Sequence, residues 1–371
     1  MKALGIVFSN IYDSSLGELT NNRTVASLPF GGRYRQIDFV LSNMSTSDIH
    51  NIGVITKYNY RSLMDHLGSC ADWDLNRKNA GLTILPPFAS GNTIVYKGKM
   101  EALYSAVHFI EEKDFDYVVL SDSNVLCTID YKPAIEKHIK SGCDVTIITA
   151  GDHADRKENH HLVVNADKKG KVQEILVDAP YKKGSFVGIG MFIIKRELLV
   201  KAINECYRKG LVHFERDFIQ RGFNENKLSV NLYEYSGIVL RNDDVQSYYK
   251  NNMLLLTKRI RDGLFNEKHP LFTKVRDEIP SKYNKGCEVK NCLIADGCEL
   301  SGEVSNSILF RGVNLQAGAK VNNCIVMQGT KIGKNAVLDY VILDKNVTVK
   351  DGTVLKGTAD HAVIVKKGET V

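Results

Sequence analysis

The chain has 371 residues, of which 43% are hydrophobic and 25% are charged, a balance typical of a globular protein with room for two domains. The formal net charge of +6 is spread along the chain without a basic tail or an arginine-rich run, so nucleic acid is not an expected partner. No stretch approaches the roughly 18 apolar residues of a membrane helix, and the N-terminal residues do not form a signal peptide, so we expect a cytoplasmic protein without a membrane partner.

The first two-thirds of the chain alternates short apolar runs with helical patterns. The apolar runs are bounded by polar turns, as buried strands are, and lie at residues 3–8, 52–55, 117–120 and 144–150. Apolar residues recur at steps of three or four in 99–113, and a second helical pattern fills 131–142. This alternation predicts a Rossmann-like, mainly parallel sheet with helices on both faces. Such sheets bind ligands beyond the carboxyl ends of their strands.

The loop after the first strand lacks the features of a phosphate site. A phosphate loop needs glycines, so that the backbone can approach the anion, and a cation that neutralises it. No Lys or Arg occurs between Lys2 and Arg23, and residues 9–20 hold one glycine, Gly17, and two acids. The loop at the usual ligand-binding edge is therefore not built to hold phosphate.

After Pro280 the period of the sequence changes. Four similar segments begin at residues 291, 306, 323 and 339, and each has two or three aliphatic residues before a turn that contains Gly297, Gly312, Gly329 or Asn346. Spacings of 15 to 17 residues fit a triangular coil with three short parallel strands per turn. A left-handed parallel β-helix is thus predicted, and an antiparallel hairpin domain is the alternative.

Three regions follow from these patterns. An α/β domain is predicted at 1–245, a helical linker region at 246–280 and the β-helix at 281–371. Eight cysteines are present without any C-x-x-C spacing, and several lie in apolar runs, so we expect buried thiols in a reducing cytosol and no metal site.

The segments that follow resemble one known family. LTNNRTVASLPFGGRYRQIDFVLSN, YVVLSDSN, HFERDFI and the terminal repeats stand in the order found in bacterial ADP-glucose pyrophosphorylase, also called glucose-1-phosphate adenylyltransferase. The resemblance covers essentially the whole chain. It implies a nucleotidyltransferase-type domain followed by a left-handed β-helix. It also implies a role in glycogen synthesis, where ATP and glucose 1-phosphate are converted to ADP-glucose and pyrophosphate.

The substrate-binding positions that the resemblance marks depart from the family pattern together. The family's first loop resembles G-G-R-G-T-R-L, whereas this chain places Ile11 and Tyr12 where the phosphates need space, and Asp13 would repel them. The phosphate-binding Lys of the family's K-R-A-K-P falls on Val25. The sugar-phosphate Lys of F-V-E-K-P falls on Ala179.

The two metal-binding aspartates of the family are also replaced. The Asp of G-D-H falls on Asn124, and the Asp of W-R-D-V-G-T falls on Arg241, which reverses the local charge. Mg²⁺ prefers carboxylate oxygens, so neither residue is a good ligand. The alternative is an active adenylyltransferase whose displaced metal ligands are Asp122 and either Asp243 or Asp244.

The loss of five groups that act together is expected to abolish turnover, because this chemistry depends on positioning and charge neutralisation. The chain therefore resembles the regulatory, non-catalytic D-type subunit of the family. That resemblance implies assembly with a catalytic paralogue, as a heterotetramer, and modulation of its activity. It implies no cofactor in this chain and Mg²⁺ only in the partner. A bifunctional uridylyltransferase–acetyltransferase is a weaker alternative, because the β-helix is short and no acetyltransferase His stands out.

Retained polar residues indicate two binding roles. Arg23, Arg35 and Arg61 match or lie at positions that form an anionic-effector pocket in the family, and His66 is the fourth residue expected there. Arginines bind phosphate oxygens bidentately, which makes a converging set a strong anion site. The alternative is that these cations pair with nearby acids such as Asp38.

A residual sugar pocket is the second role. Glu101 occupies the place of an acid in the family's G-T-A-D-A-V segment, and His213, Arg216 and Asp217 fall on its D-F-G-K-D segment. His213 and Glu215 depart from the Asp and the Gly of that pattern. For Glu101 the alternative is a solvated position on a helix.

Overall fold

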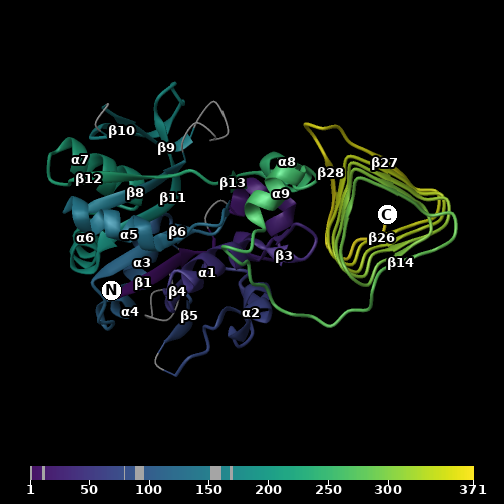
Figure 1. The fold of residues 1–371 in the computed structure, drawn as a ribbon, viewed down its shortest axis with the longest axis horizontal. Helices are drawn as coiled ribbons and strands as arrows, with labels where there is room; N and C mark the ends of the chain where they lie inside the picture. The colour runs from purple at the N-terminus through teal and green to yellow at the C-terminus, as the bar shows by residue number, and fades with distance from the viewer. Residues whose placement is uncertain (1, 11–12, 79, 88–95, 151–159, 168–169) are drawn as a thin grey trace. The chain divides into compact units, whose positions relative to one another are not determined.

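A computed structural model describes residues 2–10, 13–78, 80–87, 96–150, 160–167 and 170–371 (Figure 1). The chain forms two compact units, and each is built from three segments. Unit 1 contains Met1–Ile11, Ile37–Leu240 and Asn266–Phe272, and unit 2 contains Tyr12–Gln36, Arg241–Phe265 and Thr273–Val371. The predicted linear boundaries at 245 and 280 do not describe this division, because residues 12–36 belong to the same unit as the repeats.

Unit 1 is built on a nine-stranded sheet with the order β10-β9-β11-β6-β1-β4-β5, from which β8 and β12 branch at β11. Strands β6, β1, β4 and β5 run parallel, as do β8 and β12, whereas β11 is antiparallel to both β6 and β8. The strands are β1 (Ala3–Phe8), β4 (Asn51–Ile55), β5 (Gly81–Leu85), β6 (Tyr117–Asp122), β8 (Val145–Ala150), β9 (His160–Ala166), β10 (Val172–Ala179), β11 (Phe186–Lys195) and β12 (Val230–Tyr235). The predicted fold class is confirmed, and the four predicted strands are β1, β4, β6 and β8.

The helices of unit 1 pack on this sheet (Figure 1). They are α1 (Gln36–Thr46), α2 (Arg61–Leu67), α3 (Lys99–Ser105), α4 (Val107–Glu111), α5 (Tyr131–Ser141), α6 (Arg196–Arg208) and α7 (Arg221–Asn224). The predicted helix 99–113 is interrupted at Ala106, whose φ and ψ of −103° and 3° are not helical. Helix α5 follows its prediction: the Asp130 carboxylate accepts a hydrogen bond from Lys132 N, and Gly142 ends the helix with a φ of 64°.

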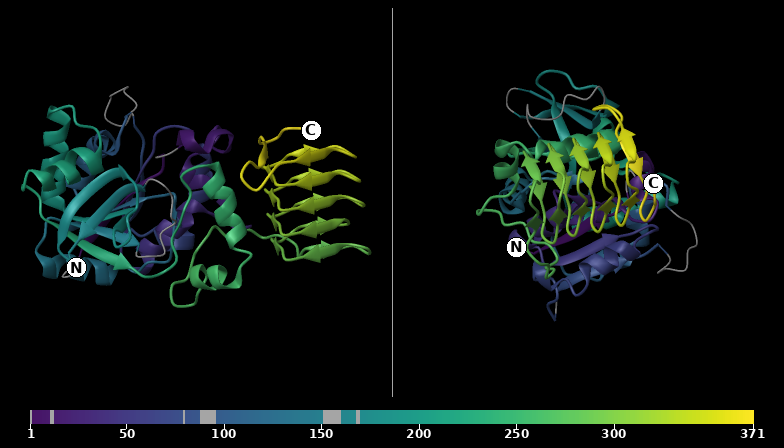
Figure 2. Two further views of the ribbon diagram at one scale, coloured as in Figure 1. Left: turned by 90° about the horizontal axis from the view of Figure 1, so that it is seen from above. Right: turned by 90° about the vertical axis from the view of Figure 1, so that its right-hand side faces the viewer.

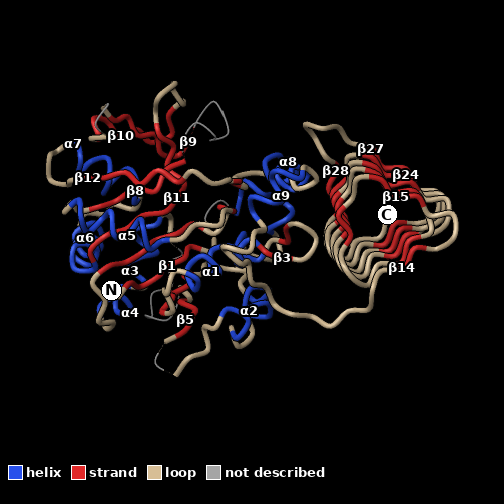
Figure 3. The backbone as a smooth tube through the Cα atoms, in the orientation of Figure 1, coloured by secondary structure: helices blue, strands red, loops and turns tan. Residues whose placement is uncertain are grey.

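Unit 2 contains a parallel β-helix of five coils, as the repeats predicted. Figure 1 shows its triangular section, Figure 2 the stacked coils and Figure 3 the strands of each face. The three five-stranded sheets have the orders β14-β17-β20-β23-β26, β15-β18-β21-β24-β27 and β16-β19-β22-β25-β28. Leu300, Leu315, Ile332 and Val349 stack in register from one coil to the next and are buried inside.

The short strands of the β-helix have the following bounds. The first sheet holds β14 (Lys282–Tyr283), β17 (Glu299–Leu300), β20 (Asn314–Leu315), β23 (Lys331–Ile332) and β26 (Thr348–Val349). The second holds β15 (Glu288–Lys290), β18 (Glu303–Ser305), β21 (Lys320–Asn322), β24 (Val337–Asp339) and β27 (Val354–Lys356). The third holds β16 (Leu293–Ile294), β19 (Ile308–Leu309), β22 (Ile325–Val326), β25 (Val341–Leu343) and β28 (Val363–Val365).

A residue in the left-handed conformation recurs at one corner of successive coils. Asn291, Asn306, Asn323 and Tyr340 each adopt a positive φ between 44° and 53°, one in each of four successive coils. Asparagine tolerates this left-handed conformation better than most residues. The Asn291 Nδ2 atom also donates a hydrogen bond to Asn306 Oδ1 over 2.9 Å, which links neighbouring coils.

The rest of unit 2 packs against the β-helix. The sequence predicted one helical region at 246–265. The structure has two helices there, α8 (Val245–Leu254) and α9 (Lys258–Leu264). The Tyr249 hydroxyl of α8 donates to the Asn323 carbonyl over 2.7 Å, and the Tyr248 hydroxyl donates to the Pro29 carbonyl over 2.6 Å. Residues 12–36 contain two 3₁₀ segments, η1 (Asp13–Thr20) and η2 (Val25–Ser27), and the two short strands β2 (Pro29–Phe30) and β3 (Tyr34–Arg35).

Cys70, Cys127, Cys206, Cys298 and Cys324 are buried, and the other three cysteines are partly exposed. Burial raises the pKa of the Cys127 thiol to about 12, so this thiol is unreactive at neutral pH. No helix in the described parts of the chain is long and apolar enough to cross a membrane.

Candidate functional site

The loop after β1 is fastened to the loop after β4 by side-chain hydrogen bonds. The Asn10 carboxamide accepts a hydrogen bond from Lys57 N over 2.9 Å and donates one to the Tyr58 carbonyl over 3.2 Å. Ser9 binds the Ile55 carbonyl through both its backbone N–H and its hydroxyl. The polar groups of Ser9 and Asn10 are therefore engaged with protein. The expected obstruction by Ile11 and Tyr12 lies outside the described residues.

A buried group of three charged side chains lies at the carboxyl end of β6. The Lys99 ammonium is 2.8 Å from Asp122 Oδ1 and 3.1 Å from Asp122 Oδ2, and it also contacts Glu215 Oε1. The side chains of Lys99 and Asp122 are only 6% and 1% exposed. We call these three residues the ion triad.

Close backbone contacts bring the members of the ion triad together. Met100 N donates a hydrogen bond to the Val212 carbonyl over 3.0 Å, which fixes the start of α3 against the segment that carries Glu215. A Cβ atom on Gly98 would lie 2.2 Å from the same carbonyl, so a side chain at this position would separate the two segments. The position of Lys99 is thus determined by packing rather than by a flexible surface contact.

Three members of the expected sugar pocket have intramolecular partners. The Asp217 carboxylate accepts hydrogen bonds from Val212 N and His213 N over 2.9 and 2.8 Å, and Arg216 pairs with Asp178 over 3.0 Å. Glu101, likewise, accepts a hydrogen bond from Lys97 N over 2.5 Å. The expected sugar-binding residues are therefore committed largely to holding α3 and the 212–217 segment in place.

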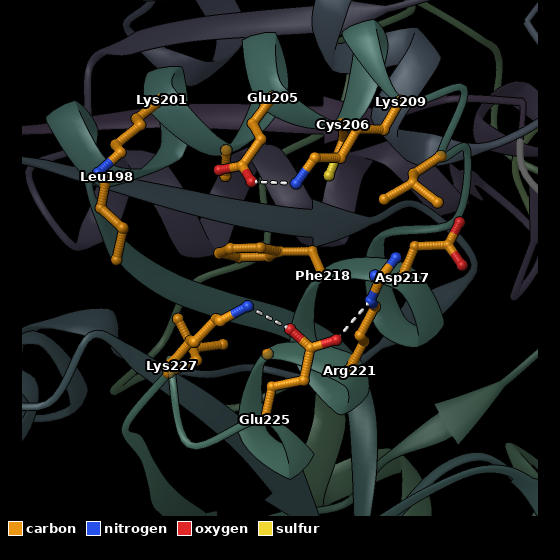
Figure 4. Close-up of a pocket in the computed structure, with 14 residues that line it drawn as sticks. Leu198, Lys201, Glu205, Cys206, Lys209, Asp217, Phe218, Arg221, Glu225 and Lys227 are labelled. Atoms are coloured by element: carbon orange, nitrogen blue, oxygen red, sulfur yellow. Dashed lines mark hydrogen bonds and ion pairs between the residues drawn. The ribbon is translucent and has the colours of Figure 1, made fainter.

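A separate hollow of about 360 Å³ lies between α6 and α7 in unit 1 (Figure 4). It includes Asp217 but none of the other expected sugar-binding residues. Cys206 and Phe218 contribute apolar surface, and five charged side chains on its wall pair with one another, namely Glu205 with Lys209, and Glu225 with both Arg221 and Lys227. This mutual pairing leaves little charge to recognise a phosphate.

The positions of the expected metal ligands do not fit a divalent cation. Asn124 is buried and offers only an amide. Arg241 donates from Nε to Asp243 Oδ1 over 2.7 Å, so the cation is held where the resemblance places a carboxylate. Asp244 caps α8, accepting from Ser247 N over 2.7 Å, and Lys99 holds Asp122. The three aspartates proposed as alternative displaced ligands, Asp122 with either Asp243 or Asp244, are therefore engaged, and the described residues contain no group of three or more metal-ligating side chains.

The two remaining degenerate positions carry no charge. Val25 is fully buried in η2, and Ala179 is the last residue of β10. Neither side chain can neutralise a phosphate.

Only two of the four residues expected to bind an effector lie in unit 2. Arg23 is buried and donates from Nη2 to both oxygens of Asp344 over 2.7 and 2.8 Å. Pairing of Arg23 with an acid was the alternative prediction, but the acid is Asp344 rather than Asp38. Arg35 is buried in the same unit.

The other two expected effector residues, Arg61 and His66, lie in α2 of unit 1. His66 Nε2 is 2.5 Å from Asp38 Oδ1, and its ring meets Trp73 edge-on at 5.7 Å. This buried pairing has the features of a structural histidine, and pairing with Asp38 is the alternative that the sequence left open.

Unit 2 holds a cluster of cations with few acids, and sequence reasoning missed its central residue, Lys345. Burial and the charges of Arg35 and Arg23 lower the pKa of Lys345 to about 6, with a smaller effect from Arg276, and only Asp344 opposes them. We call Arg23, Arg35, Arg276 and Lys345 the cation cluster.

The cation cluster continues through Arg276 to Arg311. Burial and the charges of Arg33 and Arg276 lower the pKa of Arg311, and the carboxylates of Asp296 and Glu278 oppose them. The Nε and Nη2 atoms of Arg311 are buried and have no hydrogen-bond acceptor among the described residues. A buried donor without an acceptor is unfavourable, and a bound anion would satisfy it.

The sequence contains weak signals for Lys99 and Lys345, the two charged residues that the sequence analysis did not select. Lys99 stands where the family's G-T-A-D-A-V segment has Thr, and Lys345 follows Asp344 at the turn of the last repeat. Neither position alone indicates a partner, because Asp122 and Glu215 lie 23 and 116 residues from Lys99.

The fold is that of a nucleotidyltransferase, and comparison with known proteins agrees. The family model described as "Nucleotidyl transferase" matches residues 13–236, and the model described as "GlmU-like, C-terminal hexapeptide" matches residues 278–362. The chain therefore belongs to the nucleotidyl transferase family, in the group that contains glucose-1-phosphate adenylyltransferases and the glycogen biosynthesis protein GlgD.

Similar proteins match this chain over nearly their full length. The glycogen biosynthesis protein GlgD of Bacillus subtilis (strain 168) is 34% identical, over 98% of this chain and 96% of that protein. A glucose-1-phosphate adenylyltransferase of Bacillus cytotoxicus is 29% identical over 96% of this chain and 95% of the relative. One of Bacillus mycoides (strain KBAB4) is 27% identical over 99% of both.

Proposed function

We propose that this chain is a regulatory subunit of glucose-1-phosphate adenylyltransferase in glycogen biosynthesis, without turnover of its own. It assembles with a catalytic paralogue, as a heterotetramer, and alters the activity of that partner. The observation that carries this proposal is the engagement of the aspartates near the lost metal positions. Lys99 holds Asp122, Arg241 holds Asp243, and Asp244 caps α8.

Charge explains why these contacts oppose catalysis. Attack on a phosphate of ATP needs cations at the phosphates and carboxylates that hold Mg²⁺. In this chain the carboxylates are already neutralised by protein cations, and Val25 and Ala179 supply no charge. Loss of one electrostatic contact costs roughly 10²–10³ in rate, and groups that act as a unit fail together.

We propose further that the cation cluster binds an anionic effector. Arg35 and Arg276 contribute positive charge, Lys345 takes up a proton when an anion binds, and Arg23 is held by Asp344. The two buried Arg311 nitrogens without an acceptor among the described residues supply donors in the same unit. A small anion with several oxygens, such as a sugar phosphate, matches this set of donors.

The experiment that tests the regulatory role is ADP-glucose formation from ATP, glucose 1-phosphate and Mg²⁺. It compares the purified chain, the catalytic paralogue and their mixture, with size-exclusion chromatography of each. We expect no product from the chain alone, co-elution of the two proteins, and a rate for the mixture that differs from that of the paralogue alone. Turnover by the chain alone at about 1–10³ s⁻¹ would favour the active-enzyme alternative. Separate elution with an unchanged rate would refute the regulatory role.

A further inference from the structure

The ion triad has the composition of a cation site. The Lys99 ammonium, at the start of α3, contacts the two carboxylates of Asp122 and Glu215. The rings of Phe8 and Phe192 lie 5.5 and 5.8 Å from Lys99 Nζ. Aromatic faces are negative and attract cations, as carboxylates do. Four negatively polarised groups from four elements thus surround one compact positive charge.

The charge of Lys99 is required where it lies. Asp122 is almost completely buried, and an isolated buried carboxylate is strongly unfavourable unless a cation compensates it. Phe8 and Asp122 are neighbours across β1 and β6, so the ammonium sits at the carboxyl edge of the two central strands. This is the edge at which sheets of this type bind ligands.

We propose that Lys99 is a built-in substitute for a divalent metal ion. Asp122 and Glu215 form a cation site that the chain fills with its own ammonium, and a variant without that ammonium accepts a divalent ion there. This inference concerns which cation the sheet edge holds, and it goes beyond the proposed regulatory role. Oxygen-rich sites with two carboxylates suit hard divalent ions, so Mn²⁺ is a suitable probe.

The test compares the wild-type chain with Lys99→Met, which keeps most of the side-chain volume and removes the charge. Thermal unfolding is followed with and without millimolar Mn²⁺, and bound Mn²⁺ is measured by electron paramagnetic resonance. We expect the wild-type chain to bind no Mn²⁺ at this site and to unfold at the same temperature with or without it. Lys99→Met unfolds at least about 5 °C lower, and Mn²⁺ restores about half or more of that loss.

Two further variants separate charge from packing. In Lys99→Met combined with Asp122→Asn the buried Asp122 charge is removed, and only the Glu215 carboxylate, which is 18% exposed, loses its Lys99 partner, so this chain is more stable than Lys99→Met and gains nothing from Mn²⁺. The control is Lys209→Met, which removes an exposed lysine paired with Glu205 on α6 and changes the unfolding temperature by less than about 1 °C.

Three results would overturn the inference. One is Mn²⁺ binding by the wild-type chain that Asp122→Asn abolishes. Another is a folded Lys99→Met chain that takes up no Mn²⁺. The third is a Lys99→Met chain that stays unfolded in Mn²⁺ while the double variant folds. None of these measurements uses catalysis, so failure of the regulatory role in the mixing assay is a separate result.

Discussion

The ion triad of unit 1 and the cation cluster of unit 2 differ in how far their charges are compensated by opposite charges. In the triad two carboxylates enclose one ammonium, and each charge has an opposite neighbour. In the cation cluster Arg35, Arg23 and Arg276 lower the pKa of Lys345, and the carboxylate that opposes them, Asp344, is bound by Arg23. The first arrangement pairs each charge within the protein, whereas the second brings several cations together around Asp344.

Under the proposed function, this difference is how one chain loses a catalytic site and keeps an effector site. In the ion triad Lys99 neutralises the carboxylates at the sheet edge, so a metal ion would have to displace Lys99. The lowered pKa of Lys345 shows that the cation cluster is unfavourable as it stands, and an added anion would relieve it. The variants that follow test the comparison, starting with the largest expected effect.

Arg23→Met is expected to lower the free energy of unfolding by about 3–5 kcal/mol, because it leaves the Asp344 carboxylate buried without its partner. Arg241→Met is a matched control, because the Arg241–Asp243 pair is also short but about one-fifth exposed, and a loss of about 1 kcal/mol or less is expected. Urea unfolding of the full chain measures both. Equal losses would mean that Arg23 is not the structural member of the cation cluster.

The pH dependence of anion binding tests Lys345. Its pKa is about 6 in the folded chain, whereas an unfolded lysine has a pKa near 10.4, so between these values the unfolded chain binds more protons. This residue therefore makes the free energy of unfolding rise with pH above about 6, and the dependence ends below that pH. An anion raises the pKa of Lys345, so binding at pH 8 takes up close to one proton. Affinity then falls by up to about tenfold for each pH unit above 6.

Sulfate is a suitable probe for this measurement because its charge does not change over this range. Calorimetry in two buffers with different heats of ionisation gives the number of protons taken up. Lys345→Met should bind sulfate more weakly and without proton uptake. Proton-independent binding by the wild-type chain would exclude Lys345 from the anion site.

The smallest expected effect belongs to Asp244, which the structure assigns to the capping box of α8 with Ser247. Asp244→Ala should cost about 1 kcal/mol of stability through loss of the cap, and Asp244→Ser should restore most of it because Ser is also a good N-cap. Both variants should leave the rate of the mixture with the catalytic paralogue unchanged. A drop in that rate with either variant would give Asp244 a role beyond capping.

Sequence patterns predicted the parts of this molecule that depend on local periodicity. The strands β1, β4, β6 and β8 and the coils of the β-helix follow from runs of apolar residues and from turn residues at fixed spacing. The partners of Arg23 and Lys99 were not predictable in this way, because Asp344 lies 321 residues from Arg23, and Glu215 lies 116 residues from Lys99. The resemblance marked the positions that depart from the family pattern, and the packing shows which partners the charged side chains beside them have.

The alternation of the two units along the chain restricts how this protein could exchange parts with its relatives. The segments of the units alternate, three of each, so the backbone passes from one to the other five times. A fragment cut after residue 280 would carry Asp344 without Arg23, and would lack the Tyr248 and Pro29 contact of the same unit. A chimera that exchanges only the repeats therefore separates a buried ion pair. A functional chimera therefore has to exchange residues 12–36 and 241–265 together with the β-helix, although these segments are not contiguous in the sequence.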